Sequence, residues 1–172
     1  MNIKNKFYFT KNHLWYILAI VVLVVDLVTK AITDGIVYQP AIPGIFCIES
    51  YHNTGASFSI FAGSAVAQII FIVLGILASI GLVLYSIMAK NANLNTWFFI
   101  GASLMLAGII GNVVDRIALG YVRDFISLEF MNFAVFNVAD TALTIGSICL
   151  VVWLLFFAYR NTKEEKIGKE NI

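Results

Sequence analysis

Charged residues, histidine and proline are all scarce in this chain. Charged side chains make up 12% of its 172 residues, and 11 lysines and arginines nearly balance 10 aspartates and glutamates, so no nucleic-acid partner is expected. The two histidines, His13 and His52, cannot supply an HExxH zinc motif or a serine–histidine–aspartate triad. Metal-dependent and serine-type hydrolysis are therefore disfavoured, and no metal or cofactor is expected.

Cysteine is equally rare and forms no recognisable motif. Cys47 lies in a connecting segment and Cys149 in a long apolar run, and neither belongs to a C-x-x-C pair. Because their settings differ so much, we expect no disulfide between them. Carboxylates remain the only plentiful acid–base groups.

Apolar residues, by contrast, are abundant: they make up 60% of the chain, and the mean hydropathy is +0.90. A run of about 20 apolar residues is long enough to cross a bilayer as a helix. Four such runs occur, at about 14–32, 65–89, 97–114 and 142–159. The sequence predicts a mainly α, polytopic membrane protein with four transmembrane helices, forming a single membrane domain over 1–172.

Lysines and arginines predict the orientation of these spans, since cytoplasmic segments retain positive charge. They precede the first span, separate the second from the third and follow the fourth: Lys4, Lys6, Lys11, Lys90, Arg160, Lys163, Lys166 and Lys169. Both termini are expected in the cytoplasm, with connections 33–64 and 115–141 on the outer face. The N-terminal lysines followed by the first apolar run resemble a secretory signal peptide. No small-residue cleavage site follows, so we interpret this run as a retained transmembrane span. The tail, 162–172, is expected to be solvated and frayed.

The first outer connection carries a strand pattern. Side chains alternate loosely over Phe46–His52, and Asn53-Thr54-Gly55 is typical of a turn. The apolar segment 56–62 could form a short interfacial helix. A small sheet-like cap over the membrane surface is predicted.

Small residues recur at helical spacing in two spans. Ala107 with Gly111, and Gly75 with Ser79, form small-xxx-small pairs that let helices approach closely in lipid. Close packing is the favoured interpretation, and space for a substrate is the alternative.

Polar residues inside or beside the spans need partners. Asp26 and Lys30 are four apart and can pair on one helical face, which favours a structural role over chemistry. Asn112, Asp115 and Arg116 close the third span. They either satisfy local backbone groups, with Arg116 pairing with a carboxylate, or Asn112 and Arg116 present donors to a peptide backbone or an acidic neighbour.

Asp124 and Asp140 are the strongest candidates for chemistry. Asp140 could simply cap the fourth helix, as could Asn137, but capping does not explain Asp124 within Tyr121–Ile126, a segment typical of a partly buried strand or a surface segment. If connection 115–141 folds back, the two carboxyls can meet and share one proton. Such a pair can activate water against a peptide carbonyl.

These motifs occur in a fixed order along the four spans: Asp26-x-x-Thr29-Lys30, Asn53-Thr54-Gly55-Ala56, Gly111-Asn112-x-x-Asp115-Arg116, Val122-Arg123-Asp124-Phe125 and Phe136-Asn137-Val138-Ala139-Asp140. In this order they resemble lipoprotein signal peptidase, the type II signal peptidase of bacteria. The resemblance implies an aspartyl endopeptidase of the cytoplasmic membrane, without a cofactor. It would remove signal peptides from diacylglyceryl-modified prolipoproteins, on the amino side of the lipidated cysteine.

The resemblance also implies roles for individual residues. Asp124 and Asp140 would be catalytic, and the substrate-binding residues would be Asn53, Asn112, Arg116 and Asn137. From their positions in the sequence, and not from the resemblance, Asp26, Lys30 and Asp115 are expected to be structural. A small extracytoplasmic β-cradle would lie at the outer face, close to the active site. The partners would be the lipid-modified signal peptide and membrane lipids, and the protein would act as a monomer.

Two positions depart from the family pattern. An apolar residue commonly precedes the first catalytic aspartate, where this chain has Arg123, and an alanine often stands where it has Ser57. We expect Arg123 to reach lipid headgroups, because a tight pair with Asp124 would oppose proton sharing.

Two other classes of protein compete with a protease. A proton-coupled carrier would need ionisable groups through the depth of the bilayer, yet the interiors of the second to fourth spans carry none. A purely structural subunit would have no use for both Asp124 and Asp140 beside Asn112 and Arg116.

Overall fold

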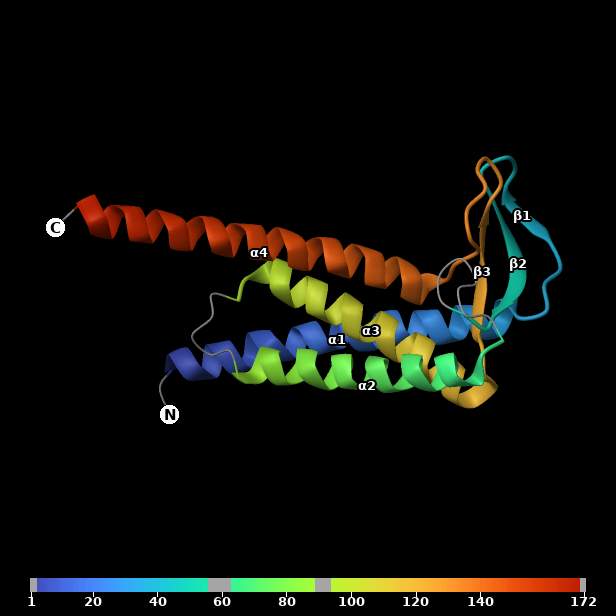
Figure 1. Cartoon of the computed structure of the whole chain (residues 1–172), viewed down its shortest axis with the longest axis horizontal. Helices are drawn as coiled ribbons and strands as arrows, with labels where there is room; N and C mark the ends of the chain where they lie inside the picture. Colours follow the sequence, from blue (N-terminus) through green and yellow to red (C-terminus); the bar gives the residue numbers. More distant parts are fainter. Residues whose placement is uncertain (1–2, 56–62, 89–93, 171–172) are drawn as a thin grey trace.

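A computed structural model describes residues 3–55, 63–88 and 94–170 of the chain. Four long helices lie alongside one another, and a small sheet covers one end of them (Figure 1). The helices are α1 (Ile3–Thr33), α2 (Ala65–Met88), α3 (Thr96–Leu119) and α4 (Val138–Glu170). Each contains a stretch long and apolar enough to cross a membrane: Trp15–Thr33, Ala65–Met88, Thr96–Leu119 and Val138–Phe156. The predicted polytopic, mainly helical fold is confirmed.

The start of α1 and the end of α4 lie at the end of the bundle opposite the sheet (Figure 1). The backbone of α4 remains helical to Glu170, so the expectation of a frayed tail is wrong for residues 162–170.

Two helices reach further toward the sheet than the predicted spans. α3 continues to Leu119, beyond the expected end at 114, and α4 begins at Val138, before the expected start at 142. The polar residues at these ends have partners, so they do not interrupt the helix. Asp115, for example, is fully buried in α3 and forms an ion pair with Arg123. α3 ends instead at Gly120, whose φ of 81° is a left-handed conformation that glycine adopts without strain.

α3 is the central helix of the bundle. Half of its apolar window is buried, compared with 6% of the window of α2. Its close approach to α4 depends on glycine, since a Cβ at Gly108 would lie 2.5 Å from the Ala139 carbonyl oxygen and one at Gly101 2.8 Å from that of Gly146.

The predicted small-residue pairs contribute one close contact each. A Cβ at Gly111 would meet the Asp26 carboxylate of α1 at 2.4 Å, and one at Gly75 would meet Val113 of α3 at 2.5 Å. Both glycines therefore serve helix packing, while Gly75 also lines a cavity described below.

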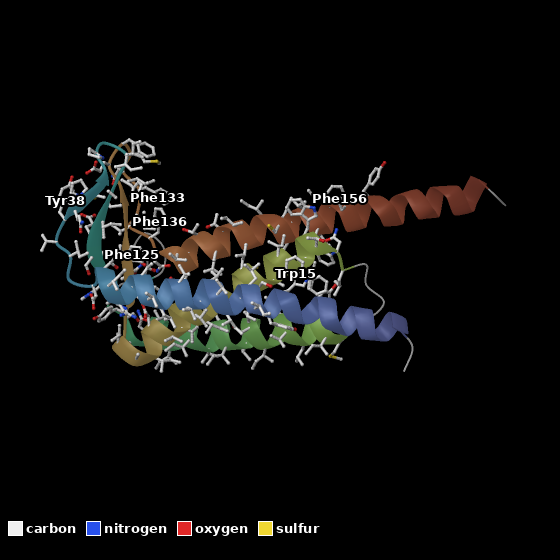
Figure 2. All side chains as sticks on the ribbon, turned by 180° about the vertical axis from the view of Figure 1, so that it is seen from behind. Trp15, Tyr38, Phe125, Phe133, Phe136 and Phe156 are labelled. Atoms are coloured by element: carbon white, nitrogen blue, oxygen red, sulfur yellow. The ribbon has the colours of Figure 1, made fainter. Side chains whose placement is uncertain are left out.

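The outward surface of the helices is apolar. Exposed isoleucine, leucine and valine side chains occur along all four, and Figure 2 shows their carbon-rich side chains projecting along the bundle. Trp15 and Phe156 lie away from the sheet, short of the far ends of α1 and α4, while Tyr38, Phe133 and Phe136 lie at the sheet end (Figure 2). Such a surface suits hydrocarbon as its solvent, because helices satisfy their own backbone hydrogen bonds.

The sheet contains β1 (Gln39–Ile42), β2 (Phe46–Asn53) and β3 (Val122–Leu128), antiparallel and in the order β1-β2-β3. β2 confirms the strand predicted over Phe46–His52. The Gly55 N–H donates to the Asn53 side-chain oxygen at 2.9 Å, as expected of a turn. The predicted interfacial helix over 56–62, and with it Ser57, lies outside the described residues.

One short pairing decides where α4 begins relative to the sheet. The backbone N–H groups of Phe125 and Ile126 both donate to the Phe136 carbonyl, at 3.1 and 2.8 Å, and the Phe136 N–H donates to Ile126 at 3.0 Å. Phe136 thereby extends the sheet beside β3. The next residue, Asn137, enters α4 directly against the strand that carries Asp124.

Candidate active site

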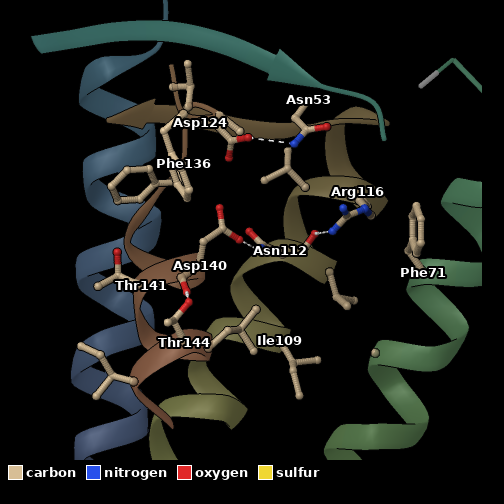
Figure 3. Close-up of a pocket in the computed structure, with 18 residues that line it drawn as sticks. Asn53, Phe71, Ile109, Asn112, Arg116, Asp124, Phe136, Asp140, Thr141 and Thr144 are labelled. Carbon is tan, nitrogen blue, oxygen red and sulfur yellow. Dashed lines mark hydrogen bonds between the residues drawn. The ribbon is translucent and has the colours of Figure 1, made fainter. Parts of the chain in front are cut away.

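A cavity of about 640 Å³ lies where the helices meet the sheet. α2, α3, α4 and the segment before α4 provide apolar walls, which include Phe71, Ile109, Val113, Leu143 and Ile145. The charged and amide side chains of the cavity gather toward the sheet (Figure 3): Asn53, Asn112, Arg116, Asp124 and Asp140. The structure therefore brings the two candidate carboxylates and three of the four predicted substrate-binding residues to one cavity.

Asp124 lies in the middle of β3 and is 1% exposed. Two amides donate to its carboxylate: Asn53 Nδ2 to Oδ2 at 2.9 Å and Asn137 Nδ2 to Oδ1 at 2.6 Å. Burial, and next the negative charge of Asp140, raise the pKa of Asp124 from 3.8 to about 7. A proton is thus held readily at this site near neutral pH.

Asp140 lies in the first turn of α4, whose N-cap is Asn137. The Asp140 N–H donates to Asn137 Oδ1 at 2.8 Å, and the Asn137 N–H donates to Asp140 Oδ2 at 3.3 Å. This reciprocal arrangement is a capping box, so the capping role expected for either residue belongs to both together. Capping uses only Oδ2 of Asp140. The other oxygen, Oδ1, accepts a hydrogen bond from Asn112 Nδ2 at 2.8 Å (Figure 3).

Asn137 is fully buried and links the two carboxylates. Its backbone binds Asp140, its side-chain nitrogen binds Asp124, and the same nitrogen donates to Asn112 Oδ1 at 3.2 Å. It does not line the cavity as the other predicted substrate-binding residues do. Its position supports a role in orienting the carboxylates.

Behind this cluster lies the predicted ion pair of α1. Lys30 Nζ is 2.9 Å from Asp26 Oδ2, and both side chains are buried. The pair also reaches the site, since Lys30 donates to Asn112 Oδ1 at 2.9 Å and Asp26 Oδ1 accepts the Ala139 N–H at 2.8 Å. The sequence spacing predicts the pair but gives no signal of these contacts with α3 and α4.

Arg123 does not extend toward lipid headgroups, so that expectation is wrong. Its guanidinium forms an ion pair with the buried Asp115, with Nη2 2.7 Å from Oδ1. Asp115 lies beside the start of β3, and its unpaired charge would be costly, which explains why the arginine turns inward. The pair with Asp124, the other alternative, is not formed either; Asp124 binds two amides instead.

Arg116 faces the cavity from the last turn of α3. Its Nη2 donates to the Gly55 carbonyl at 3.1 Å, and its guanidinium lies 5.2 Å from the centre of the Phe71 ring (Figure 3). The interaction with Phe71 could not be predicted, because this phenylalanine lies in a uniformly apolar span. Arg116 thus joins α2, α3 and the end of β2 around the opening.

This fold and this cavity define a polytopic membrane protein with two carboxylates held at one end of its helical bundle. The chain belongs to the signal peptidase II family, whose model matches residues 18–156, and it is accordingly a protease. Its relatives include the lipoprotein signal peptidase of Enterococcus faecalis, 39% identical over 75% of this chain and 73% of that enzyme. That of Microcystis aeruginosa is 40% identical over 84% of this chain and 93% of the other. The predicted family is confirmed.

A solved structure described as a bacterial membrane enzyme has the same fold. It superposes with a TM-score of 0.75 at 35% sequence identity, covering 83% of this chain and 88% of the other. A second such structure gives a TM-score of 0.72 over 83% of this chain, also at 35% identity.

Proposed function

We propose that this chain is an aspartyl endopeptidase that removes the signal peptide from diacylglyceryl-modified prolipoproteins, cutting on the amino side of the lipidated cysteine. Membership of the signal peptidase II family supports a prolipoprotein substrate. The observation that carries the aspartyl mechanism is the connection of Asp124 and Asp140 through Asn137 in one cavity.

The two carboxyls share one proton and take different roles. Asp124 is the protonated member, because burial and the neighbouring charge raise its pKa to about 7. Asp140 is the ionised member, because the N-terminal turn of α4 and the donated hydrogen bond from Asn112 favour its negative charge.

In the chemical step, Asp140 takes a proton from water as the water oxygen attacks the scissile carbonyl carbon. Asp124 donates its proton in a hydrogen bond to the carbonyl oxygen and stabilises the charge that develops there. When the C–N bond breaks, the proton on Asp140 passes to the leaving nitrogen. Asp124 keeps its own proton, and the starting state returns.

The rest of the cavity suits a membrane-embedded substrate. Its walls are apolar between α2, α3 and α4, as the signal peptide requires, and Asn53, Asn112 and Arg116 offer donors near the carboxylates. The charged and amide side chains of the cavity gather at its sheet end, which suits cleavage near a membrane surface. Because basic residues gather at both ends of the chain, we place both termini in the cytoplasm of a bacterium and the site near the outer face of its membrane.

The test is cleavage of a purified lipidated prolipoprotein by the full-length chain in detergent. Asp124→Asn and Asp140→Asn are each expected to abolish cleavage. An amide at position 140 cannot accept the proton of water, and an amide at position 124 cannot share a proton with Asp140 and is a weaker hydrogen-bond donor to the carbonyl oxygen than a carboxylic acid. The matched control is Asp34→Asn, which removes an exposed aspartate at the same end of the bundle. Substantial turnover by either active-site variant would refute the aspartyl mechanism.

A further inference from the structure

Arg123 and Asp115 form a clamp at the junction between α3 and β3, which we call the Asp115–Arg123 clamp. Three N–H groups of Arg123 donate to the carboxylate: backbone N at 3.0 Å and Nε at 3.3 Å to Oδ2, and Nη2 at 2.7 Å to Oδ1. Asp115 is fully buried, whereas the side chain of Arg123 is 17% exposed. Both carboxylate oxygens are therefore bound by one residue of the next strand.

This clamp fixes the residue directly before Asp124. The backbone N–H of Arg123 is held by Asp115, and its carbonyl oxygen accepts Asn137 Nδ2 at 3.4 Å. The same Asn137 nitrogen binds Asp124. Side chains from two different helical segments thus hold both backbone groups of Arg123, and with them the position from which Asp124 projects.

The clamp also determines what Lys30 binds. Lys30 Nζ is 3.5 Å from Asp115 Oδ2, farther than from Asp26 and Asn112, both at 2.9 Å. Because Arg123 occupies Asp115, Lys30 remains available to the Asn112 oxygen. Without the guanidinium, the buried Asp115 charge would have Lys30 as its nearest cation and would draw it away from Asn112.

Asn112 transmits this effect to Asp140. With its oxygen bound by Lys30, the amide directs its nitrogen toward Asp140 Oδ1 at 2.8 Å. Without Lys30 the Asn112 oxygen keeps only the longer hydrogen bond from Asn137 Nδ2, at 3.2 Å, so the amide is held less firmly and its donation to Asp140 weakens. The clamp therefore acts on both carboxylates, on Asp124 through the backbone and on Asp140 through Lys30 and Asn112.

We propose that Arg123 is a positioning residue: by binding both oxygens of Asp115 it fixes the start of β3 and reserves Lys30 for Asn112, so that Asp124 and Asp140 keep their amide donors. This proposal rests on the proposed function for its kinetic test. It requires no contact between Arg123 and the substrate.

The kinetic test compares Arg123→Leu, Arg123→Lys and Asp34→Asn on a lipidated prolipoprotein. For Arg123→Leu we expect kcat to fall about 10- to 100-fold, as one lost hydrogen bond to a charged group predicts, with KM changed less than about threefold. Arg123→Lys retains the charge and should recover most of kcat. Asp34→Asn removes a charge that faces Arg123 but does not touch Asp115, and should match the wild type.

A double variant separates positioning from simple loss of folding. In Arg123→Leu/Asp115→Asn the buried charge that would draw Lys30 is gone, so kcat should exceed that of Arg123→Leu. An unchanged kcat in Arg123→Leu, a loss confined to KM, or a double variant no better than Arg123→Leu would overturn the proposal.

A readout without substrate distinguishes this proposal from the proposed function. The protonation of Asp124 can be followed by infrared spectroscopy of its carboxyl band, assigned by its absence in Asp124→Asn. The groups that act on Asp124 are Asp140 of α4, Lys30 of α1, Arg116 of α3, Asn53 of β2 and Asn137. Weakened amide donors should raise its titration midpoint in Arg123→Leu but not in Asp34→Asn.

The cleavage assay and the titration of Asp124 therefore test the proposed function and the positioning role separately. A wild-type chain that cleaves no prolipoprotein, together with a raised midpoint in Arg123→Leu, would refute the proposed function and support the positioning role. An unchanged midpoint in Arg123→Leu would overturn the positioning role even if the wild type is active.

Discussion

Asn137 donates a 2.6 Å hydrogen bond to Asp124, although Asn137 caps α4 and Asp124 lies in the middle of β3. The pairing of Phe136 with Ile126 brings them together. Because Asn137 also forms the capping box with Asp140, one residue links the start of a helix to both candidate catalytic carboxylates.

Replacing Asn137 with alanine should reduce activity more than its effect on stability explains. The capping oxygen is lost, which costs about 1 kcal/mol of stability, and Asp124 also loses a donor. The matched control is Asn95→Ala, since Asn95 caps α3 by accepting the Phe98 N–H. Thermal unfolding should shift in both variants, and further in Asn137→Ala because buried hydrogen bonds are lost with the cap, whereas kcat should fall only in Asn137→Ala. An equal loss of kcat in the two would contradict the role of Asn137.

Activity should fall as the pH rises through about 7. The proposed mechanism needs one proton on the Asp124–Asp140 pair, and the pKa of Asp124 lies at about 7 because of burial and the charge of Asp140. Above this pH the last shared proton is lost, and no donor to the substrate carbonyl remains. A kcat profile measured between about pH 5 and about pH 9 tests this; an alkaline limb that begins only near pH 9 would argue against it.

Stability should also fall as the pH rises, but over a lower range than activity. The pKa of Asp124 is raised from 3.8 to about 7 on folding, so its contribution is fully present below the lower value and is lost as the pH rises through the higher one. The melting temperature should therefore drop between about pH 4 and about pH 7, and drop less in Asp124→Asn, which cannot ionise. Identical drops in both proteins would show that Asp124 does not titrate in this window.

Lys30→Met should destabilise the protein strongly. It leaves the buried Asp26 without its cation, and breaking such a pair costs about 3–5 kcal/mol. The Asn112 oxygen also loses a donor, so kcat should fall. The rise in activation free energy should be smaller than the loss in the free energy of unfolding. Thermal unfolding and turnover measured on the same preparation give both quantities. The double variant Lys30→Met/Asp26→Asn should regain part of the stability, and the absence of any recovery would refute the pairing.

Gly111→Ala should be disruptive, unlike Gly81→Ala. A Cβ at position 111 would lie 2.4 Å from Asp26 Oδ2, whereas one at position 81 would meet nothing within 4 Å. Gly81 lies within α2, where alanine is favoured over glycine by about 0.5–1 kcal/mol. Gly81→Ala should therefore melt at or above the wild-type temperature and Gly111→Ala well below it. Equal melting temperatures would mean that α1 and α3 do not approach so closely here.

Much of the fold follows from local patterns. Four apolar runs predict four helices because a bilayer requires about 20 apolar residues to be crossed. Alternation over Phe46–His52 predicts β2 because side chains of a strand alternate between two faces. The helix ends at 119 and 138 could not be predicted, since Asp115 and Asp140 resemble terminators until their partners are known.

The sequence by itself determined the class of protein, the four spans, the Asp26–Lys30 pair and the family, because hydropathy, helical spacing and ordered motifs are properties of the chain alone. Only the tertiary structure decided that Asn137 lies between Asp124 and Asp140, and that Arg123 binds Asp115 rather than lipid. The physical reason is that a buried polar group must find a partner. Which partner such a group binds depends on which distant segments of the chain fold together, here α3, β3 and the start of α4.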